Sequence, residues 1–200
     1  LIKAIVLKYP ESVRLLNKPK RMEYQDEIDY LISNAQRNRF IKNLALSLKG
    51  NGIILFGRVE KHGEILFDDI KTSTNRPVYY VSGKIKKAET EQIRVEVNKE
   101  DNAILLASMG KFSEGVSIPS LKWGILVHPS KAKIGLIQRI GRGLRKSKGK
   151  ELFTMYDIAD DLSYKKKPNH TISHFVERIK LYNEEEFDYK IYNIEVKENR

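Results

Sequence analysis

The chain has 200 residues, of which 40% are hydrophobic, enough for one packed domain with an appendage. Cysteine is absent, which excludes disulfides, thiolate nucleophiles and cysteine-based zinc sites. The net charge of +11 favours nucleic acid or another polyanion as partner, with simple lysine-rich solubilisation as the alternative.

No apolar run approaches the roughly 18–20 residues that span a bilayer, so we expect no membrane partner. The start, LIKAIVLKYP, lacks the apolar core and cleavage site of a secretory signal, and it also lacks an initiator Met. We therefore expect a chain that is a fragment of something longer. The four histidines are scattered, and no metal site is expected from them. The pair His170 and His174 has helical spacing without an HExxH pattern, which favours a solvated helix start.

The first eight residues predict a strand, and residues 24–48 predict helix from the spacing of Ile28, Leu31 and Ile32. Gly50-Asn51-Gly52 then ends the helical pattern. Further strands are expected at 53–56, 78–81, 103–107, 123–127 and 152–156, with helices at 59–70, 87–98 and 132–146. In the helix at 59–70, the residues expected to face inward are Val59, Ile65, Leu66 and Ile70. A glycine-containing turn is expected after the strand at 103–107.

The run Ile53-Ile54-Leu55-Phe56 is typical of a strand buried on both faces. Short apolar strands alternating with helices predict an α/β fold, a parallel sheet with helices on both faces. Such sheets place ligands beyond the carboxyl ends of their strands.

The tail has a different composition. Residues 164–168 read as a basic linker. Residues 171–185 predict an amphipathic helix whose apolar stripe comprises Ile172, Phe175, Val176, Ile179 and Tyr182. We expect this helix to dock back on the domain, with binding to a partner as the alternative. The final FDYKIYNIEV alternates and then changes phase, which predicts a strand with a bulge.

The stretch QRIGRGLR (138–145) carries the most specific chemistry. On a helix, Gln138, Gly141, Arg142 and Arg145 share one face. Guanidinium groups bind phosphate oxygens bidentately, and a glycine between them allows a ligand to approach closely. This face is typical of a phosphate site. The alternative is a solvated basic helix, which does not need the two glycines.

A second stretch, SMGKFSEGVSIP (108–119), directly follows a predicted strand and offers small hydroxyl residues and backbone N–H groups to an anion. By itself it is better explained as an ordinary βα loop. The two stretches together are more specific, because they resemble motifs V and VI of superfamily 2 helicases. QRIGRGLR matches Q-x-x-G-R-x-x-R in full, and GVSIPSL (115–121) is similar to G-[IV]-[DN]-[IV]-P.

The resemblance covers about residues 24–160. IILFGRVEKHGEIL (53–66) is similar to motif IV and its helix, and VYYVSG (78–83) to the next strand and turn. Within the superfamily the sequence most resembles the UvsW recombination helicases of T-even-like phages, with similarity continuing through YDIADD (156–161) into the tail.

The resemblance implies a RecA-like lobe (P-loop NTPase type) at 24–161, preceded by a lead-in at 1–23 and followed by an appendage at 162–200. It implies ATP and Mg²⁺ as cofactors, bound mainly by an N-terminal RecA-like lobe of the same protein. The P-loop and DExH box of that lobe are absent here, and Asp26-Glu27 lies in a predicted helix rather than at a strand end.

The resemblance also implies residue roles. Arg145 and Arg142 would reach the terminal phosphates of the nucleotide, and Gln138 would position the finger or the attacking water. Gly115, Ser117 and Gly141 would lie near the nucleotide, although Ser117 replaces the frequent Asp or Asn and puts a ribose contact in doubt. The nucleic-acid contacts would come from residues at strand ends: Arg58, Ser82, Lys84, Ser108 (where the family usually has Thr), Lys111 and Lys131.

The function expected from this resemblance is the C-terminal motor lobe of an ATP-dependent DNA helicase or translocase that acts on branched DNA: junctions, forks and R-loops. The alternatives are a non-catalytic nucleic-acid-binding or partner-docking module, and the lobe of an RNA helicase or a restriction translocase. Surface charge alone is the competing explanation for each single lysine.

Overall fold

The computed structural model describes residues 1–17, 22–113, 118–128 and 153–197, and the helix expected at 132–146 lies outside them. The described strands are β1 (Ile2–Lys8), β2 (Gly52–Phe56), β3 (Val78–Val81), β4 (Ile104–Ser108), β5 (Trp123–Leu126), β6 (Thr154–Asp161) and β7 (Tyr189–Glu195). They form one sheet in the order β3-β4-β2-β5-β6-β1-β7, and every neighbouring pair is parallel. The predicted parallel α/β sheet is therefore confirmed.

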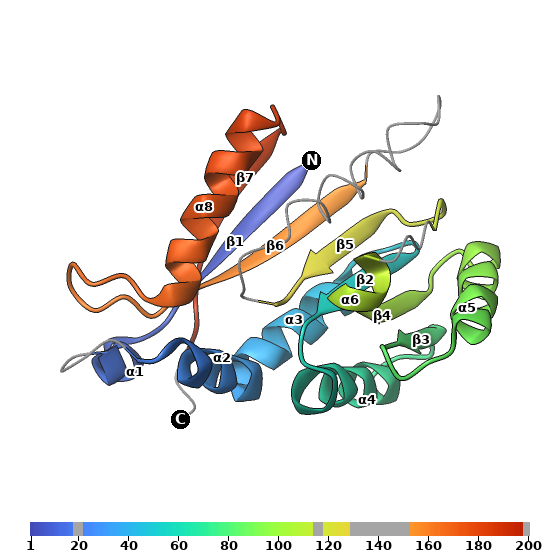
Figure 1. Ribbon diagram of the computed structural model, residues 1–200, viewed down its shortest axis with the longest axis horizontal. Helices are drawn as coiled ribbons and strands as arrows, with labels where there is room; N and C mark the ends of the chain where they lie inside the picture. The colour runs from blue at the N-terminus through green and yellow to red at the C-terminus, as the bar shows by residue number, and fades with distance from the viewer. Residues whose placement is uncertain (18–21, 114–117, 129–152, 198–200) are drawn as a thin grey trace.

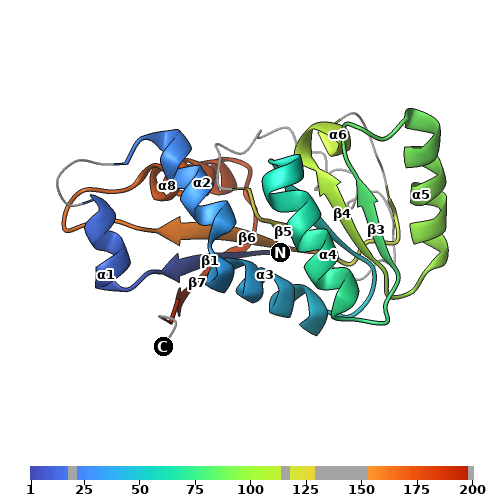
Figure 2. The same cartoon turned by 90° about the horizontal axis from the view of Figure 1, so that it is seen from below.

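Helices cover both faces of this sheet (Figures 1 and 2). The described helices are α1 (Glu11–Arg14), a 3-10 turn (Leu15–Asn17), α2 (Tyr24–Ser33), α3 (Ala35–Ser47), a π-helix η2 (Val59–Glu64), α4 (Ile65–Thr72), α5 (Lys87–Lys99), α6 (Met109–Ser113) and α8 (His170–Glu184). One apolar cluster joins the sheet to α2, α3 and α4, and another joins it to α5, α6 and α8. Every residue of β2, β4 and β5 is buried, as a strand between two helical layers requires.

The helix expected at 24–48 is two helices. Asn34 adopts an extended conformation between them, and its side-chain oxygen accepts a hydrogen bond of 2.9 Å from the Arg37 backbone N–H. Asparagine is a preferred N-cap residue, so it ends α2 and begins α3.

The helix expected at 59–70 starts as the π-helix η2. Its wider i→i+5 turn changes which residues face the core. Leu66 and Ile70 are buried as expected, but the inward placement of Ile65 is wrong, because its side chain is 52% exposed. His62 is buried in its place.

Two strand ends differ from expectation. β4 leads directly into the short helix α6 rather than into a turn. β6 continues to Asp161, well past the expected end at Tyr156, although its last half is rich in aspartate. The strand tolerates these acids because Asp157 and Asp160 pair with the buried Arg178 and Arg37.

The tail docks on the domain, as expected. Tyr182 of α8 donates a hydrogen bond of 2.8 Å to Asp157, and the same carboxylate accepts one of 2.8 Å from Arg178 Nε. The expected stripe is wrong at Val176, which is 50% exposed, because α8 turns Arg178 and Leu181 inward instead. His170 begins α8, and its ring and that of His174 pack edge-on against Tyr24.

The final strand, β7, has no bulge, because its register with β1 is unbroken from Tyr189 to Glu195. The described β1 and β7 come from the ranges expected as lead-in and appendage, yet they share one sheet with the central strands. The division at residues 23 and 161 stays a prediction.

Candidate functional site

The carboxyl ends of the parallel strands meet at one edge of the sheet, and the described site candidates gather there. Ser108 pairs in register with Phe56, two residues before Arg58, and Ala107 pairs with Val81, which precedes Ser82. The strands β3, β4 and β2 are neighbours in the sheet. The structure therefore places Arg58, Ser82, Lys84, Ser108 and Lys111 along one stretch of that edge.

The two serines of this set are buried, with Ser82 1% and Ser108 6% exposed. The Ser108 hydroxyl accepts a hydrogen bond of 3.4 Å from the Lys111 backbone N–H, so it caps the first turn of α6. Lys111 itself is half-buried in that turn. In this arrangement Ser108 positions the start of α6 through its side chain.

The cations of this edge are held by acidic and amide groups from neighbouring helices. Lys84 lies 2.8 Å from a carboxylate oxygen of Glu60 and 3.6 Å from one of Glu64, both in η2. Its hydrogen bond with Glu60 raises the pKa of Lys84 and lowers that of Glu60. Arg58, which is exposed, donates to the side-chain amide oxygen of Gln25 in α2. The helices α2 and η2 thus line the edge and contact two of its cations, Arg58 and Lys84.

A buried polar group lies where β5 ends. Arg37 of α3 is fully buried; its Nε donates to both oxygens of Asp160 at 2.9 and 3.1 Å, and its Nη2 donates 2.7 Å to the Val127 carbonyl. The imidazole of His128 follows, and it lies against Gly57 so closely that a Cβ on that glycine would be 2.3 Å from His128 Nδ1. Burial, together with the positive charges nearby, Arg37 first among them, lowers the pKa of His128 to about 4.

The other predicted site residues lie outside the described part of the chain. They are Gln138, Gly141, Arg142, Arg145, Gly115, Ser117 and Lys131. The sequence prediction in turn missed Gln25, Glu60 and Glu64, which hold the edge cations, and Arg37, which reaches the end of β5. A strand-end pattern cannot find these residues, because each belongs to a helix and contacts the edge through the fold.

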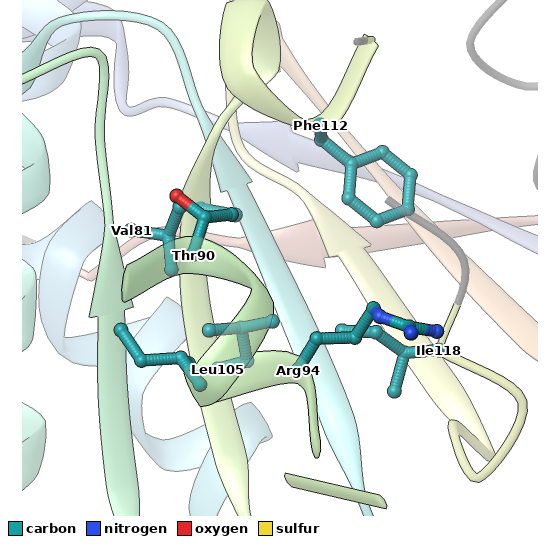
Figure 3. Close-up of a pocket in the computed structure, with 8 residues that line it drawn as sticks. Val81, Thr90, Arg94, Leu105, Phe112 and Ile118 are labelled. Carbon is teal, nitrogen blue, oxygen red and sulfur yellow. The ribbon is translucent and has the colours of Figure 1, made fainter. Parts of the chain in front are cut away.

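A small apolar cavity lies between α5 and the sheet, below α6 (Figure 3). Its lining is Val81, Thr90, Ile93, Arg94, Leu105, Ala107, Phe112 and Ile118. Of the predicted site residues that the structure describes, none lines it, and the charged Arg94 pairs with Glu91 on its own helix at 2.8 Å. The cavity is a packing space behind the strand-end edge.

Across the described residues, no group of three histidine or acidic side chains could hold a metal ion. The helices within those same ranges are all too short or too polar to cross a membrane.

The chain matches the model of the helicase conserved C-terminal domain over residues 35–147. It is 33% identical over 201 residues to the ATP-dependent DNA helicase UvsW of Enterobacteria phage T4, a match that covers 94% of this chain and 39% of that protein. A putative helicase of Sulfolobus islandicus filamentous virus is 35% identical over 79 residues, which cover 40% of this chain and 14% of that protein.

The crystal structure of T4 UvsW superposes with a TM-score of 0.83 at 34% identity, covering 98% of this chain and 42% of that one. The C-terminal domain of the DEAD-box protein Dbp5 superposes with a TM-score of 0.62 at 14% identity, covering 96% of this chain and 90% of that one, and so shows the fold alone. The predicted RecA-like fold is confirmed. The chain spans about two-fifths of the length of the helicase that it matches along most of its sequence.

Proposed function

Since the chain belongs to the family of helicase conserved C-terminal domains, we propose that it is the C-terminal motor lobe of an ATP-dependent DNA helicase or translocase. The observation that carries this proposal is the similarity to UvsW along 94% of the chain. The matched family range, 35–147, also contains the complete QRIGRGLR pattern.

In this proposal the nucleotide lies between this lobe and an N-terminal RecA-like lobe of the same protein, which supplies the P-loop and holds most of the ATP and Mg²⁺. Arg145 and Arg142 stabilise the charge on the terminal phosphates, and Gln138 positions the finger or the attacking water. Arginine fingers contribute about 10³–10⁵ in rate where they have been measured. Gly115, Ser117 and Gly141 face the nucleotide.

The nucleic acid follows the strand-end edge and contacts Arg58, Ser82, Lys84, Ser108, Lys111 and Lys131. Ser82 and Ser108 are buried as whole residues, so the phosphate contacts come mainly from the cations of this set. Contacts of lysine and arginine with phosphates give binding that depends on salt and not on sequence. The substrates are branched DNA, such as junctions, forks and R-loops, in the cytoplasm of a phage-infected host.

The test of the motor role uses the full-length protein and the substitution Arg145→Ala. We expect the variant to fold and to bind DNA nearly as the wild type does, and to lose nucleic-acid-stimulated ATP hydrolysis by about 10³-fold or more. Near-normal turnover would remove Arg145 from its role. Turnover absent from the wild type itself would favour the non-catalytic binding module.

The substrate class needs a second experiment. The full-length protein is assayed for stimulated ATP hydrolysis with branched DNA, linear duplex DNA and RNA of matched length. We expect branched DNA to stimulate most. Preference for RNA would indicate an RNA helicase, and preference for linear duplex would indicate a translocase of the restriction type.

A further inference from the structure

We propose that Arg37 and Asp160 are positioning residues that fix the point where the chain leaves β5. This inference rests on the proposed function, because the residues that follow this point in sequence, 129–152, contain the QRIGRGLR face. The groups that carry the inference all lie within the described residues; they are Arg37, Gly57, Val127, His128 and Asp160.

The central contact is the Arg37 guanidinium. Its Nε donates to both oxygens of Asp160 on β6, at 2.9 and 3.1 Å, and its Nη2 donates 2.7 Å to the carbonyl of Val127, the residue after β5. Both charged side chains are fully buried. One rigid, planar cation therefore ties the end of β5 to the end of β6 and to helix α3.

Residues of β2 and of the turn that follows it also contact the end of β5. The Val127 backbone N–H donates 3.1 Å to the Leu55 carbonyl, and the His128 ring packs directly on Gly57. The exit of the chain from β5 is thus fixed on two sides, by a hydrogen-bonded cation and by a glycine that leaves room for the imidazole.

Stability alone is a poor explanation for this arrangement. A buried ion pair is often no more stabilising than apolar residues of the same volume, because both charges must be removed from water. Here the cation also uses one of its donors on a main-chain carbonyl at a strand end. Such a contact fixes a position, and a misplacement of about 1 Å at a catalytic group can cost about 10²-fold in rate.

The variant Arg37→Met removes the hydrogen bonds to Val127 and to Asp160 and puts an apolar side chain of similar length in place of the cation. Tyr9→Phe is the matched control. It removes a hydrogen bond of 2.9 Å to the same Asp160 carboxylate but leaves the hydrogen bond between Arg37 and the Val127 carbonyl in place. Gly57→Ala displaces the His128 ring and leaves the buried charged residues unchanged. It provides the test of the fixed strand exit if Arg37→Met does not fold.

All three variants are made in the full-length protein and assayed at a temperature where circular dichroism shows them folded. We expect Arg37→Met and Gly57→Ala to lower kcat for stimulated ATP hydrolysis about tenfold or more, with smaller changes in KM for ATP and in DNA affinity. Tyr9→Phe should keep kcat within about twofold of the wild type even where its melting temperature falls. Equal kcat values in all three would overturn the inference.

A second readout does not depend on the proposed function. Amide hydrogen exchange in the peptide that contains Val127 and His128 should be about tenfold faster in Arg37→Met than in Tyr9→Phe. If the wild type shows no ATP hydrolysis, the motor proposal fails and this comparison alone decides the positioning role. Equal exchange in the two variants would refute that role.

Discussion

At the scale of single residues, His62 is a polar group buried at a cost. Among the residues that the structure describes, neither of its ring nitrogens has a hydrogen-bond partner. The side chain is fully buried within the π-helix η2. Burial holds the pKa of His62 well below its ordinary value, and the charge of Arg37 lowers it further. A polar group buried without a partner costs about 1–3 kcal/mol. A π-turn at the end of a strand beside the site is where such a cost is commonly found.

This burial predicts a pH dependence of stability. In the unfolded chain His62 and His128 ionise near pH 6.5, whereas the folded protein keeps them neutral, with the pKa of His128 at about 4. As the pH falls from about 6.5 towards 4, the unfolded state binds more protons. The free energy of unfolding therefore decreases, by at most about 1.4 kcal/mol per pH unit for each histidine.

The variant His62→Leu tests this prediction. It should be at least as stable as the wild type at neutral pH, because no hydrogen bond is lost, and its stability should decline less steeply between about pH 6.5 and 5. Urea unfolding at a series of pH values measures both quantities. An unchanged slope would contradict the prediction.

At the scale of elements, α2 holds the start of α8 through one buried carboxylate. Glu27 accepts hydrogen bonds from the backbone N–H groups of Thr171 at 2.7 Å and His170 at 2.8 Å. These are N–H groups of the first helical turn, where a negative charge is also favoured by the helix dipole.

Replacing Glu27 by alanine leaves these buried donors without a partner. We expect Glu27→Ala to lower the free energy of unfolding by about 2–3 kcal/mol. The control is Asp26→Ala, since Asp26 is the exposed neighbouring acid on the same helix, and it should change stability by less than about 0.5 kcal/mol. Chemical denaturation measures both, and equal losses would mean that helix propensity and not capping is responsible.

The π-helix η2 sets the charge of the strand-end edge. Glu60 pairs with Lys84, which the proposed function assigns to a nucleic-acid phosphate. Glu60→Gln should remove the nearer of the two carboxylates beside that lysine and raise nucleic-acid affinity about two- to threefold at low salt, with a smaller effect at high salt.

The matched control is Glu91→Gln. It changes the net charge by the same amount, but Glu91 pairs with Arg94 on α5. Fluorescence anisotropy with a labelled oligonucleotide compares the two variants. An equal gain in affinity would indicate that overall charge, and not Lys84, is responsible.

Several elements could be predicted from the sequence because their signals are local. The continuous apolar runs of β2 and β4 indicated buried strands, and the stripe with Phe175 and Tyr182 indicated that α8 docks. Other features depend on distant partners. The acid-rich end of β6 is accommodated as strand because its aspartates meet buried cations from other elements, as Asp160 meets Arg37, which is 123 residues away.

The candidate site, too, could be predicted from the sequence only where its signals are local. The strand-end rule brought Arg58 and Lys84 to one edge, since it needs only the strand boundaries. It could not show that Gln25 and Glu60 hold these cations, because those contacts follow from how α2 and η2 pack. Ile65 was misplaced for a related reason, because no sequence pattern signalled the π-turn that changed its direction.

At the scale of the whole molecule, the sheet places the described candidate site residues along a single edge. The parallel order β3-β4-β2-β5 aligns four strand ends, and α2 and η2 line the same edge. The described part of this edge offers cations for phosphates, and it has no cluster of acids that could hold a metal ion. In the proposed function, the complementary half comes from a second lobe with a P-loop, so neither half alone carries the reaction.

The two-lobe arrangement of the proposed function predicts how the isolated chain behaves in assays of ATP hydrolysis and DNA binding. Arginine fingers stabilise a transition state only where phosphates and Mg²⁺ are already held, so the 200-residue chain should not hydrolyse ATP above background, with or without DNA. Phosphate release is measured beside the full-length protein, and circular dichroism establishes that the chain is folded. DNA affinity should remain measurable and fall steeply with salt, because the basic edge is still present. ATP hydrolysis by the folded chain would refute the two-lobe arrangement. If the folded chain neither hydrolyses ATP nor binds DNA, the nucleic-acid path lies on the other lobe.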